Sequence, residues 1–309
     1  MGEPVRFNGD HKRRNPHIEK LSQHLTLQSI CPEVGIGLPV PREPIRLVDQ
    51  GANQATPLRL MDSNTQTIDY TEAIEAFADS TQGAYPFCGY ILVKGSPSCG
   101  LERVKRYSAK GKLIASDASG LFTKRLQQND PLLPLEEDGR LYDHGLRESF
   151  VSRVYLYHDW RLFRQQTLTA SSLLAFYSQY KYLVMAHSVS HYQELGKLLA
   201  NLKNEELETI AQRLIEGMMV SLKKVATPAS HTNVLQHLQG YLKNKIDSQQ
   251  KRELSKVIDD YRRGIVPLIT PLTLLQHHFN RTPDPYIEKQ TFMAPYPSEL
   301  ALRSVIPSY

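Results

Sequence analysis

The sequence of 309 residues has no long hydrophobic run and only three cysteines. A membrane helix needs roughly 20 consecutive apolar residues, and no uninterrupted apolar stretch approaches that length, so we expect no membrane span. The first residues, Met1 to Arg6, lack the apolar core of a secretory signal, and three cysteines are too few for a disulfide framework. These absences predict a cytoplasmic protein whose thiols are reduced, bound to metal or buried.

What the chain does contain is the composition of a globular protein, with 40% hydrophobic and 22% charged residues. Its length suffices for two domains with ordinary cores. Up to about residue 145, short apolar runs alternate with turns, whereas later apolar residues recur every three or four positions. We therefore predict an α/β domain over residues 1–145, with an open, mostly parallel sheet, and an all-α helical domain over residues 146–309.

The charge is distributed unevenly between the two halves. Residues 1–150 carry 18 Lys and Arg against 19 Asp and Glu, whereas residues 151–309 carry 19 against 13 and hold 11 of the 16 tyrosines. A basic surface with aromatic side chains suits RNA, because phosphates bind cations and unstacked bases stack on rings. A solvated helical surface over a tyrosine-rich core fits the same composition, so composition alone leaves both interpretations open.

Two of the cysteines lie in turns that follow short apolar stretches. Cys31 opens a Cys-Pro-Glu turn after residues 25–30, and Cys99 lies in Ser-Pro-Ser-Cys-Gly after the β-like run 90–93. Because the carboxyl ends of parallel strands form one crevice in an open α/β sheet, the two thiols can converge. Two separately buried thiols are the alternative. Zinc is another, although neither turn has the paired cysteine spacing of common zinc sites.

The segments that carry these cysteines resemble the thiouracil desulfidase (TudS-type) domain. The similar residues are 2–9 (Gly-Glu-Pro-Val-Arg-Phe-Asn-Gly), 31–42 (Cys-Pro-Glu-Val-Gly-Ile-Gly-Leu-Pro-Val-Pro-Arg) and 96–103 (Ser-Pro-Ser-Cys-Gly-Leu-Glu-Arg). Further along, residues 231–237, 240–241, 260–264 and 271–278 resemble the YbgA-type helical domain that is often fused to it. The resemblance spans nearly the whole chain.

The resemblance implies an enzyme that holds a 4Fe-4S cluster by three cysteines, leaves one iron open, and removes sulfur from thiolated uracil without net redox chemistry. Two-domain members resemble enzymes that convert 4-thiouridine in tRNA to uridine. The expected partner is therefore tRNA or a thiolated nucleobase, and no obligate protein partner is evident. The alternatives are a desulfidase of free thiouracil and a non-catalytic RNA-binding remnant.

By the same resemblance, Cys31 and Cys99 fall on two of the three cluster positions. The third belongs to a Ser-x-Cys-Leu-Leu-Gly segment ahead of Glu-Pro-Val-Arg, and the sequence begins at Met1. We expect Met1 to be an internal methionine of a longer reading frame, the first strand of the sheet to be missing, and a cysteine to stand three residues before Gly2. Cys88 precedes the strand that Cys99 follows, so we expect it to be a small buried residue.

Hydrolysis of a thiocarbonyl group needs a base that activates water and a donor that protonates the ring. Glu33, two residues after Cys31, is the candidate acid/base. A turn carboxylate bonded to backbone is the alternative role for it. Ser96 and Ser98 are candidates for hydrogen bonds to the substrate or to cluster sulfur, although serines also stabilise turns.

Basic side chains within or near the family-like segments are the candidate contacts to tRNA. In the first domain, Arg42, Arg46, Arg103 and Lys105 either meet phosphates and ribose around the target base or are solvated charges. The candidates in the second domain are Lys181, His231, His237, Lys243, Arg262, Arg263, His277 and His278. Adjacent histidines on a helix point about 100° apart and do not form one chelating face. We therefore expect RNA contacts or structural hydrogen bonds rather than a metal site there.

Overall fold

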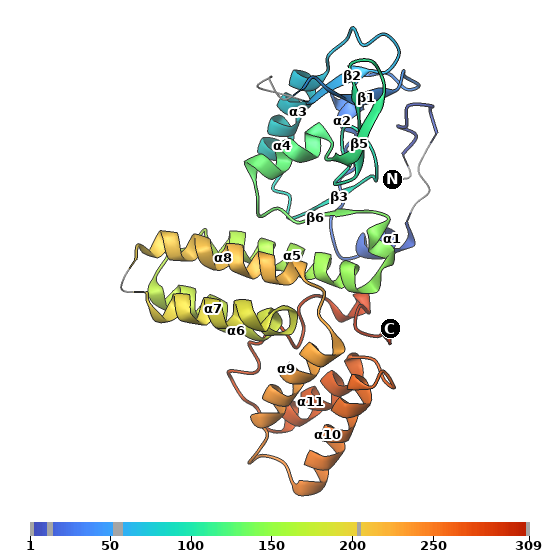
Figure 1. Cartoon of the computed structure of the whole chain (residues 1–309). Helices are drawn as coiled ribbons and strands as arrows, with labels where there is room; N and C mark the ends of the chain where they lie inside the picture. Colours follow the sequence, from blue (N-terminus) through green and yellow to red (C-terminus); the bar gives the residue numbers. More distant parts are fainter. Residues whose placement is uncertain (1–2, 11–14, 52–57, 203–204, 307–309) are drawn as a thin grey trace. The chain divides into compact units, whose positions relative to one another are not determined.

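The structure, a computed structural model, describes residues 3–10, 15–51, 58–202 and 205–306. The chain folds into two compact units, Met1–Tyr142 and Asp143–Tyr309 (Figure 1). The first unit mixes helices and strands, and the described part of the second is helical, so the predicted α/β and all-α classes are confirmed, although parallel and antiparallel strand pairs are equal in number among the described residues. Met1 and Gly2, on which the expectation of an upstream strand and cysteine depends, lie outside the described residues. Within the described ranges, no helix is long and apolar enough to cross a membrane.

The first unit is built on two small sheets. Its strands are β1 (Ile45–Asp49), β2 (Leu58–Asp62), β3 (Tyr90–Leu92), β4 (Val104–Ser108), β5 (Leu113–Ala118) and β6 (Leu135–Glu137). The larger sheet has the order β2-β1-β4-β5, with β1 and β4 parallel and the two flanking pairs antiparallel. In the smaller sheet, β3 pairs with β6 in parallel. The turn that carries Cys99 lies between β3 and β4.

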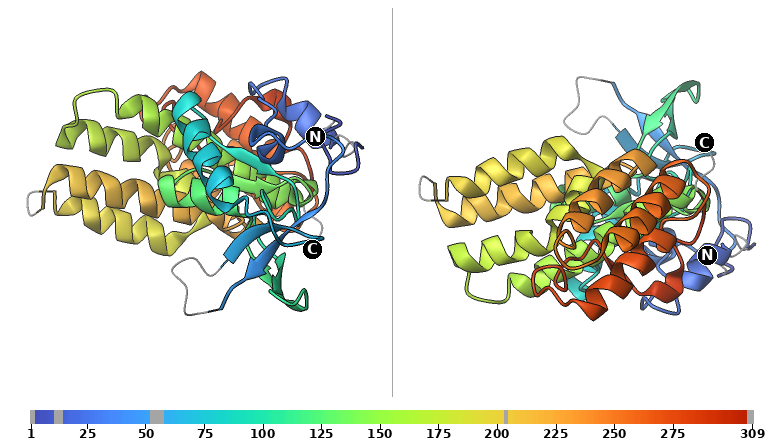
Figure 2. Two further views of the ribbon diagram at one scale, coloured as in Figure 1. Left: turned by 90° about the horizontal axis from the view of Figure 1, so that it is seen from above. Right: turned by 90° about the horizontal axis from the view of Figure 1, so that it is seen from below.

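Helices cover one face of the larger sheet and close its core. The helices of this unit are α1 (Pro16–Leu21), α2 (Pro32–Gly35), α3 (Thr71–Ala84), α4 (Leu121–Asn129) and a 3-10 turn at Arg140–Tyr142. Leu47 and Leu60 from the sheet pack with Ile74 of α3 and Phe122 of α4, and all four are fully buried. Burial of each such side chain contributes about 1.5–3 kcal/mol. This core fixes α4 against the sheet (Figures 1 and 2).

The second unit consists of helices whose starts are marked in the sequence. Asp143 caps the first helix by accepting a hydrogen bond from the N–H of Leu146, and Thr169, Thr227 and Asp247 form capping boxes at three others. The helices are α5 (His144–Phe163), α6 (Ala170–His187), α7 (Val189–Ala200), α8 (Leu207–Lys223), α9 (Pro228–Gly240), α10 (Ser248–Arg262), α11 (Ile269–Arg281) and a 3-10 turn at Ser298–Leu300. Local sequence therefore marks the starts of several of these helices, whereas α8 and α11 begin without a side-chain cap.

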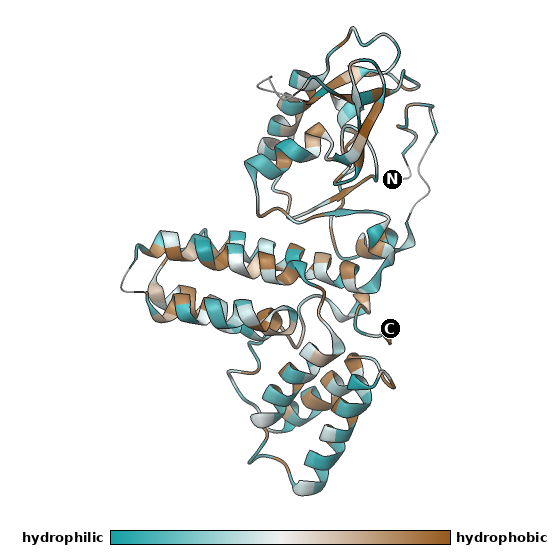
Figure 3. Cartoon of the chain, in the orientation of Figure 1, coloured by the Kyte–Doolittle hydropathy of each residue, from teal (hydrophilic) through white to brown (hydrophobic). Residues whose placement is uncertain are grey.

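The apolar stripes of these helices face one another within the unit. Helices α5 to α8 lie side by side, and α9 to α11 form a second group (Figures 1 and 2). Leu173, Leu214 and Leu235 are fully buried. Hydrophobic residues recur along the helices between hydrophilic ones (Figure 3), as the helical period of the sequence predicts. After α11 the chain is mostly irregular and bonds to α6 through Thr291 N and Gln179 O at 2.9 Å.

Candidate functional site

The turn at Cys31 and the turn at residues 96–100 meet through side chains. Cys31 occupies the N-cap position of α2, and Glu33 is the second residue of that helix. Glu33 Oε1 accepts a hydrogen bond from Ser98 Oγ at 2.6 Å, and Ser98 Oγ lies 2.9 Å from Ser96 Oγ. The structure thus brings together segments that are 65 residues apart in sequence. We call the set Cys31, Glu33, Arg42, Ser96, Ser98 and Cys99 the two-turn site.

Arg42 holds the glutamate from the other side. Its Nε and Nη2 each lie 2.7 Å from Glu33 Oε2, and Nη2 also donates to the carbonyl oxygen of Val5 at 2.9 Å. The Arg42 side chain is only 4% exposed and that of Glu33 13%. The Arg42 guanidinium therefore binds a carboxylate and is not a freely solvated charge, while its contact with tRNA stays a prediction. The guanidinium fixes the position of Glu33.

Both thiols border this carboxylate. Cys31 Sγ lies 3.9 Å from Arg42 Nη2, and the backbone N–H of Cys99 donates to Ser96 Oγ at 3.3 Å. Burial raises the pKa of the Cys99 thiol, and the hydrogen bond with Ser96 lowers it. The charges of Glu33 and Cys31 raise it further, so these groups lie within electrostatic reach of Cys99. The two cysteines therefore lie in turns that the hydrogen bond between Ser98 and Glu33 joins.

The start of α4 supports the turn that carries Cys99. Phe122 N donates to Ser98 O at 3.0 Å, and Gly120 N donates to Gly100 O at 2.9 Å. A Cβ atom at Gly120 would lie 2.4 Å from Ser98 O, so only glycine permits this close backbone approach. Sequence reasoning missed this support because Gly120 lies outside the cysteine motif.

Tyr90 is a further residue of this region that sequence reasoning did not assign. Its ring packs against those of Phe87 and Phe122, with centroids 5.8 and 5.7 Å apart. Its hydroxyl is buried and has no hydrogen-bond partner among the described residues. Burial raises the pKa of Tyr90, and the nearby Cys99 and Cys31 raise it further, so the hydroxyl remains protonated. Its place at the start of β3, the strand before the Cys99 turn, was the only available signal.

The described residues supply two thiols for a cluster, one fewer than the resemblance implies. Within the described ranges, no three His, Cys, Asp or Glu side chains are grouped closely enough to hold a metal ion. The third cysteine, Cys88, is half-buried before β3, with its Sγ 3.8 Å from Pro86 O. The ligand set that the structure describes is thus incomplete for a 4Fe-4S cluster.

A second polar cluster lies inside the helical unit. Glu148 Oε1 accepts hydrogen bonds from Tyr296 Oη at 2.7 Å and Arg303 Nε at 2.8 Å. Burial opposes the charge of Glu148, but the positive charges of Arg303 and His231 and the hydrogen bonds from Arg303 and Tyr296 together outweigh it and lower the pKa of Glu148 to about 2. Burial also lowers the pKa of the neighbouring His231 to about 3. We call Glu148, His231, Tyr296 and Arg303 the buried ion-pair cluster.

Comparison with known proteins agrees with the two-part architecture. A family described as "2-thiouracil desulfurase" matches residues 1–138, and a family described as "Protein of unknown function (DUF1722)" matches residues 181–297. The uncharacterized protein YbgA of Escherichia coli (strain K12) is 33% identical over 157 residues, which are 50% of this chain and 93% of YbgA. The chain belongs to the YbgA family. It joins a TudS-type desulfidase region to a YbgA-like region, as the resemblance implied.

Among solved structures, a 4Fe-4S-dependent thiouracil desulfidase, TudS, is similar with a TM-score of 0.36 and 24% identity, over 46% of this chain and 87% of that one.

Two predicted RNA contacts of the YbgA-like region are buried. His231 lies on the core face of α9, where its Nδ1 is 2.7 Å from Tyr261 Oη. His278 lies on the core face of α11 and is 5% exposed. Of the two roles expected for these histidines, RNA contact or a structural role, burial favours the structural one, because the helical phase turns both rings into the core.

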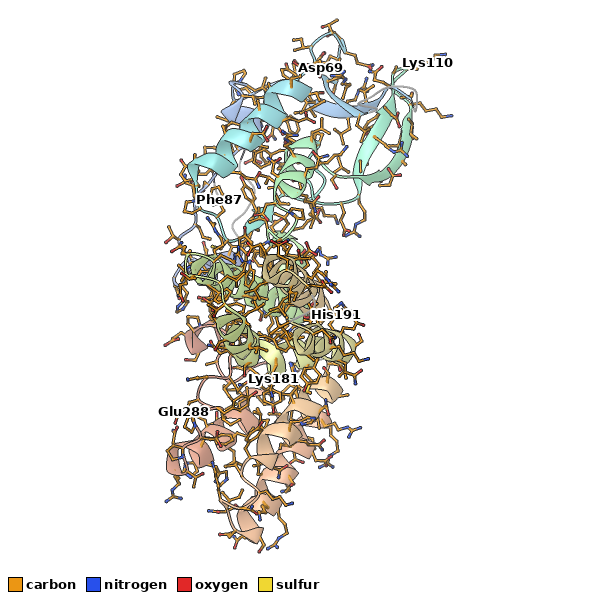
Figure 4. All side chains as sticks on the ribbon, turned by 90° about the vertical axis from the view of Figure 1, so that its left-hand side faces the viewer. Asp69, Phe87, Lys110, Lys181, His191 and Glu288 are labelled. Atoms are coloured by element: carbon orange, nitrogen blue, oxygen red, sulfur yellow. The ribbon has the colours of Figure 1, made fainter. Side chains whose placement is uncertain are left out.

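The other predicted contacts of this region lie at or near the surface. His237, Lys243, Arg262, Arg263 and His277 are exposed. Arg263 is paired with Asp259 at 3.0 Å and Asp260 at 2.6 Å. The half-buried Lys181 of α6 (labelled in Figure 4) has its ammonium 4.8 Å from the ring centroids of both Tyr182 and Tyr286. For all of these residues, contact with RNA stays a prediction.

The remaining cations of the first unit differ in their surroundings. Lys105 is exposed, and so is Arg103, which pairs with Glu102 at 3.1 Å. Arg46 is half-buried, with its guanidinium 5.5 Å from the centroid of the Tyr107 ring. Their contacts with RNA also stay a prediction.

Proposed function

We propose that the chain is a 4Fe-4S-dependent desulfidase that removes the sulfur of 4-thiouridine in tRNA to give uridine. The observation that carries this proposal is the hydrogen bond from Ser98 to Glu33, which joins the two cysteine turns in one site. The match of residues 1–138 to a 2-thiouracil desulfurase family supports the reaction class. The excess of basic residues in the second half supports a polyanionic substrate.

The reaction exchanges the sulfur of a C=S group for oxygen from water. Water adds to the ring carbon, the carbon–sulfur bond breaks, and sulfur leaves as hydrogen sulfide, so no electrons are gained or lost. A bound 4Fe-4S cluster would supply Lewis-acid activation, and Cys31 and Cys99 are the thiolates that the described chain offers it.

Glu33 is the group placed to take the proton of the attacking water. Arg42 holds its Oε2, which leaves Oε1 to exchange a proton with water while Ser98 Oγ keeps the carboxylate in orientation. Ser96, 2.9 Å from Ser98, extends this hydrogen-bonded chain. The protonated Tyr90 hydroxyl is a donor for the substrate ring, because no described residue accepts from it.

In this proposal the YbgA-like region binds tRNA. Its exposed cations, Lys243, Arg262 and Arg263 among them, would neutralise phosphates. A base held within tRNA must be turned out before a protein can act on it. Binding of the surrounding nucleotides by a separate helical unit would contribute the free energy for this step.

The full chain, prepared without oxygen and supplied with iron and sulfide, tests the proposal on two substrates. We expect release of sulfide from tRNA that contains 4-thiouridine, with a higher kcat/KM than from free thiouracil. A preference for the free base would instead support a desulfidase of free thiouracil, the second candidate, which the description of the matched family favours. Release from neither substrate by cluster-loaded protein would overturn both.

A further inference from the structure

A pocket of about 570 Å³ opens in the helical unit, beside α11 and the segment that follows it. Gln276, Phe279 and Asn280 line it from α11, and residues 283, 287–291, 293 and 294 line the rest. Its volume lies in the range of about 300–1,000 Å³ that is usual for small-ligand sites. None of these residues belongs to the two-turn site or to the predicted tRNA contacts.

Gln290 offers the pocket a fixed hydrogen-bond acceptor. Its side chain is 3% exposed, and its Nε2 donates to Ser178 O at 3.0 Å and to Tyr286 O at 3.2 Å. These two bonds fix the orientation of the amide. Its Oε1 is buried and finds no donor among the described residues. Buried acceptors are seldom left without a donor, so an N–H group is the partner that this oxygen lacks.

The rest of the lining suits a neutral ligand that carries both donors and acceptors. Gln276 Nε2 donates to Asn280 Oδ1 at 2.7 Å, which leaves Gln276 Oε1 as an acceptor and Asn280 Nδ2 as a donor. Phe279 and Ile287 supply buried apolar surface. The charges of Lys289 and of Glu288, which points outward in Figure 4, offset each other. This balance of charge does not favour a phosphate inside the pocket.

We infer that this pocket binds a nucleobase, which is planar and carries N–H donors beside carbonyl acceptors. We assign the base to an unpaired nucleotide of tRNA. The exposed Arg281 follows Asn280 at the end of α11, and Lys289 lines the pocket, so both can meet flanking phosphates. The inference rests on the proposed function and gives the helical unit a role in reading a base.

A substitution that fills the pocket tests this inference in the full chain. Ala294 is exposed and lines the pocket, and Ala229 is exposed on α9 and does not. We expect Ala294→Trp to weaken binding of a fluorescently labelled tRNA about 10-fold, or about 1.4 kcal/mol, with Ala229→Trp like wild type. The salt dependence of binding should not change, because a base contact releases no counterions. Asn280→Ala should also weaken binding.

The outcomes separate this inference from the proposed function. Equal melting temperatures of the two tryptophan variants would show that both are folded. Wild-type affinity for tRNA in both Ala294→Trp and Asn280→Ala overturns the inference. Loss of uridine binding alone, observed by NMR with tRNA binding intact, would assign the pocket to a free nucleoside and overturn the RNA assignment. If the wild-type chain binds no tRNA, the tRNA part of the proposed function fails with it, and the uridine measurement decides whether the pocket binds a base.

Discussion

The two-turn site and the buried ion-pair cluster each hold a glutamate against an arginine, but in different surroundings. Glu33 lies in the short helix α2, accepts a hydrogen bond from Ser98 on the oxygen that Arg42 does not bind, and belongs to a site with two thiols. Glu148 lies in α5 among packed helices, where a tyrosine and an arginine donate to one of its oxygens. An ion pair by itself therefore does not mark a functional site. The nearby thiols distinguish the first pair from the second.

The largest expected effect is on stability, from Glu148→Ala. Removing one partner of a buried ion pair leaves Arg303 charged and unpaired, which typically costs about 3–5 kcal/mol. Thermal unfolding followed by circular dichroism should show a much lower midpoint. Glu194→Ala, which removes an exposed glutamate on α7, is the control. Equal midpoints of thermal unfolding for the two variants would contradict the structural role that we assign to the buried ion-pair cluster.

Acid should weaken the helical unit through the same cluster. The pKa values of Glu148 and His231 in the folded state are lowered to about 2 and about 3, from ordinary values of 4.5 and 6.5. The unfolded chain therefore binds protons first, and stability is lost as pH falls from about 6.5 towards 2. Urea unfolding at several pH values measures this loss. A free energy of unfolding that stays constant between pH 7 and pH 4 would contradict the assignment of His231.

Next to the two-turn site, Gly120→Ala should have an intermediate effect on stability. The added Cβ would press on Ser98 O, and overpacking of this kind costs about 1–3 kcal/mol. Gly83→Ala in α3 is the matched control, because a Cβ there meets nothing within 4 Å. We expect only Gly120→Ala to lower both the melting midpoint and the rate of sulfide release. If Gly83→Ala behaved the same way, the close approach at Ser98 would not be the cause.

The smallest effects concern exposed cations and can sharpen the contrast between paired and unpaired charges. Arg263 already pairs with two aspartates, whereas no ion pair of Arg262 is found among the described residues. We expect Arg262→Glu to lower the salt slope of tRNA binding by about 0.7–0.9, and Arg263→Glu to lower it less. Anisotropy titrations at several salt concentrations measure both slopes. Unchanged slopes would take both arginines out of the interface.

The residues of the two-turn site could largely be found from sequence because they lie in short motifs at turns. Cys31 and Glu33 come from one motif and Ser98 and Cys99 from another, and the structure brings the motifs together while their roles stay predictions. The pairing of Arg42 with Glu33 could not be predicted, because residue type does not show whether a cation faces solvent or a carboxylate. Tyr90 and Gly120 were missed because each acts through packing with elements that lie apart in sequence.

In the helical unit, periodicity predicted the helices but not the polar interior. For His231 and His278 the sequence left RNA contacts and structural hydrogen bonds open, and the helical phase places both residues in the core. The pairing of Glu148 with Arg303 joins positions 155 residues apart, one in a helix and one in irregular chain. No local pattern reports such a contact. Tertiary packing alone creates the buried ion-pair cluster.

The proposed mechanism requires Glu33 to take a proton from the attacking water. The rate of sulfide release by Glu33→Gln tests this directly. The amide keeps the size of the side chain but does not take up a proton. We predict a loss of about 100-fold or more in a protein that still unfolds cooperatively, with Glu102→Gln, at an exposed glutamate of the same unit, close to wild type. Wild-type sulfide release by Glu33→Gln would contradict the account.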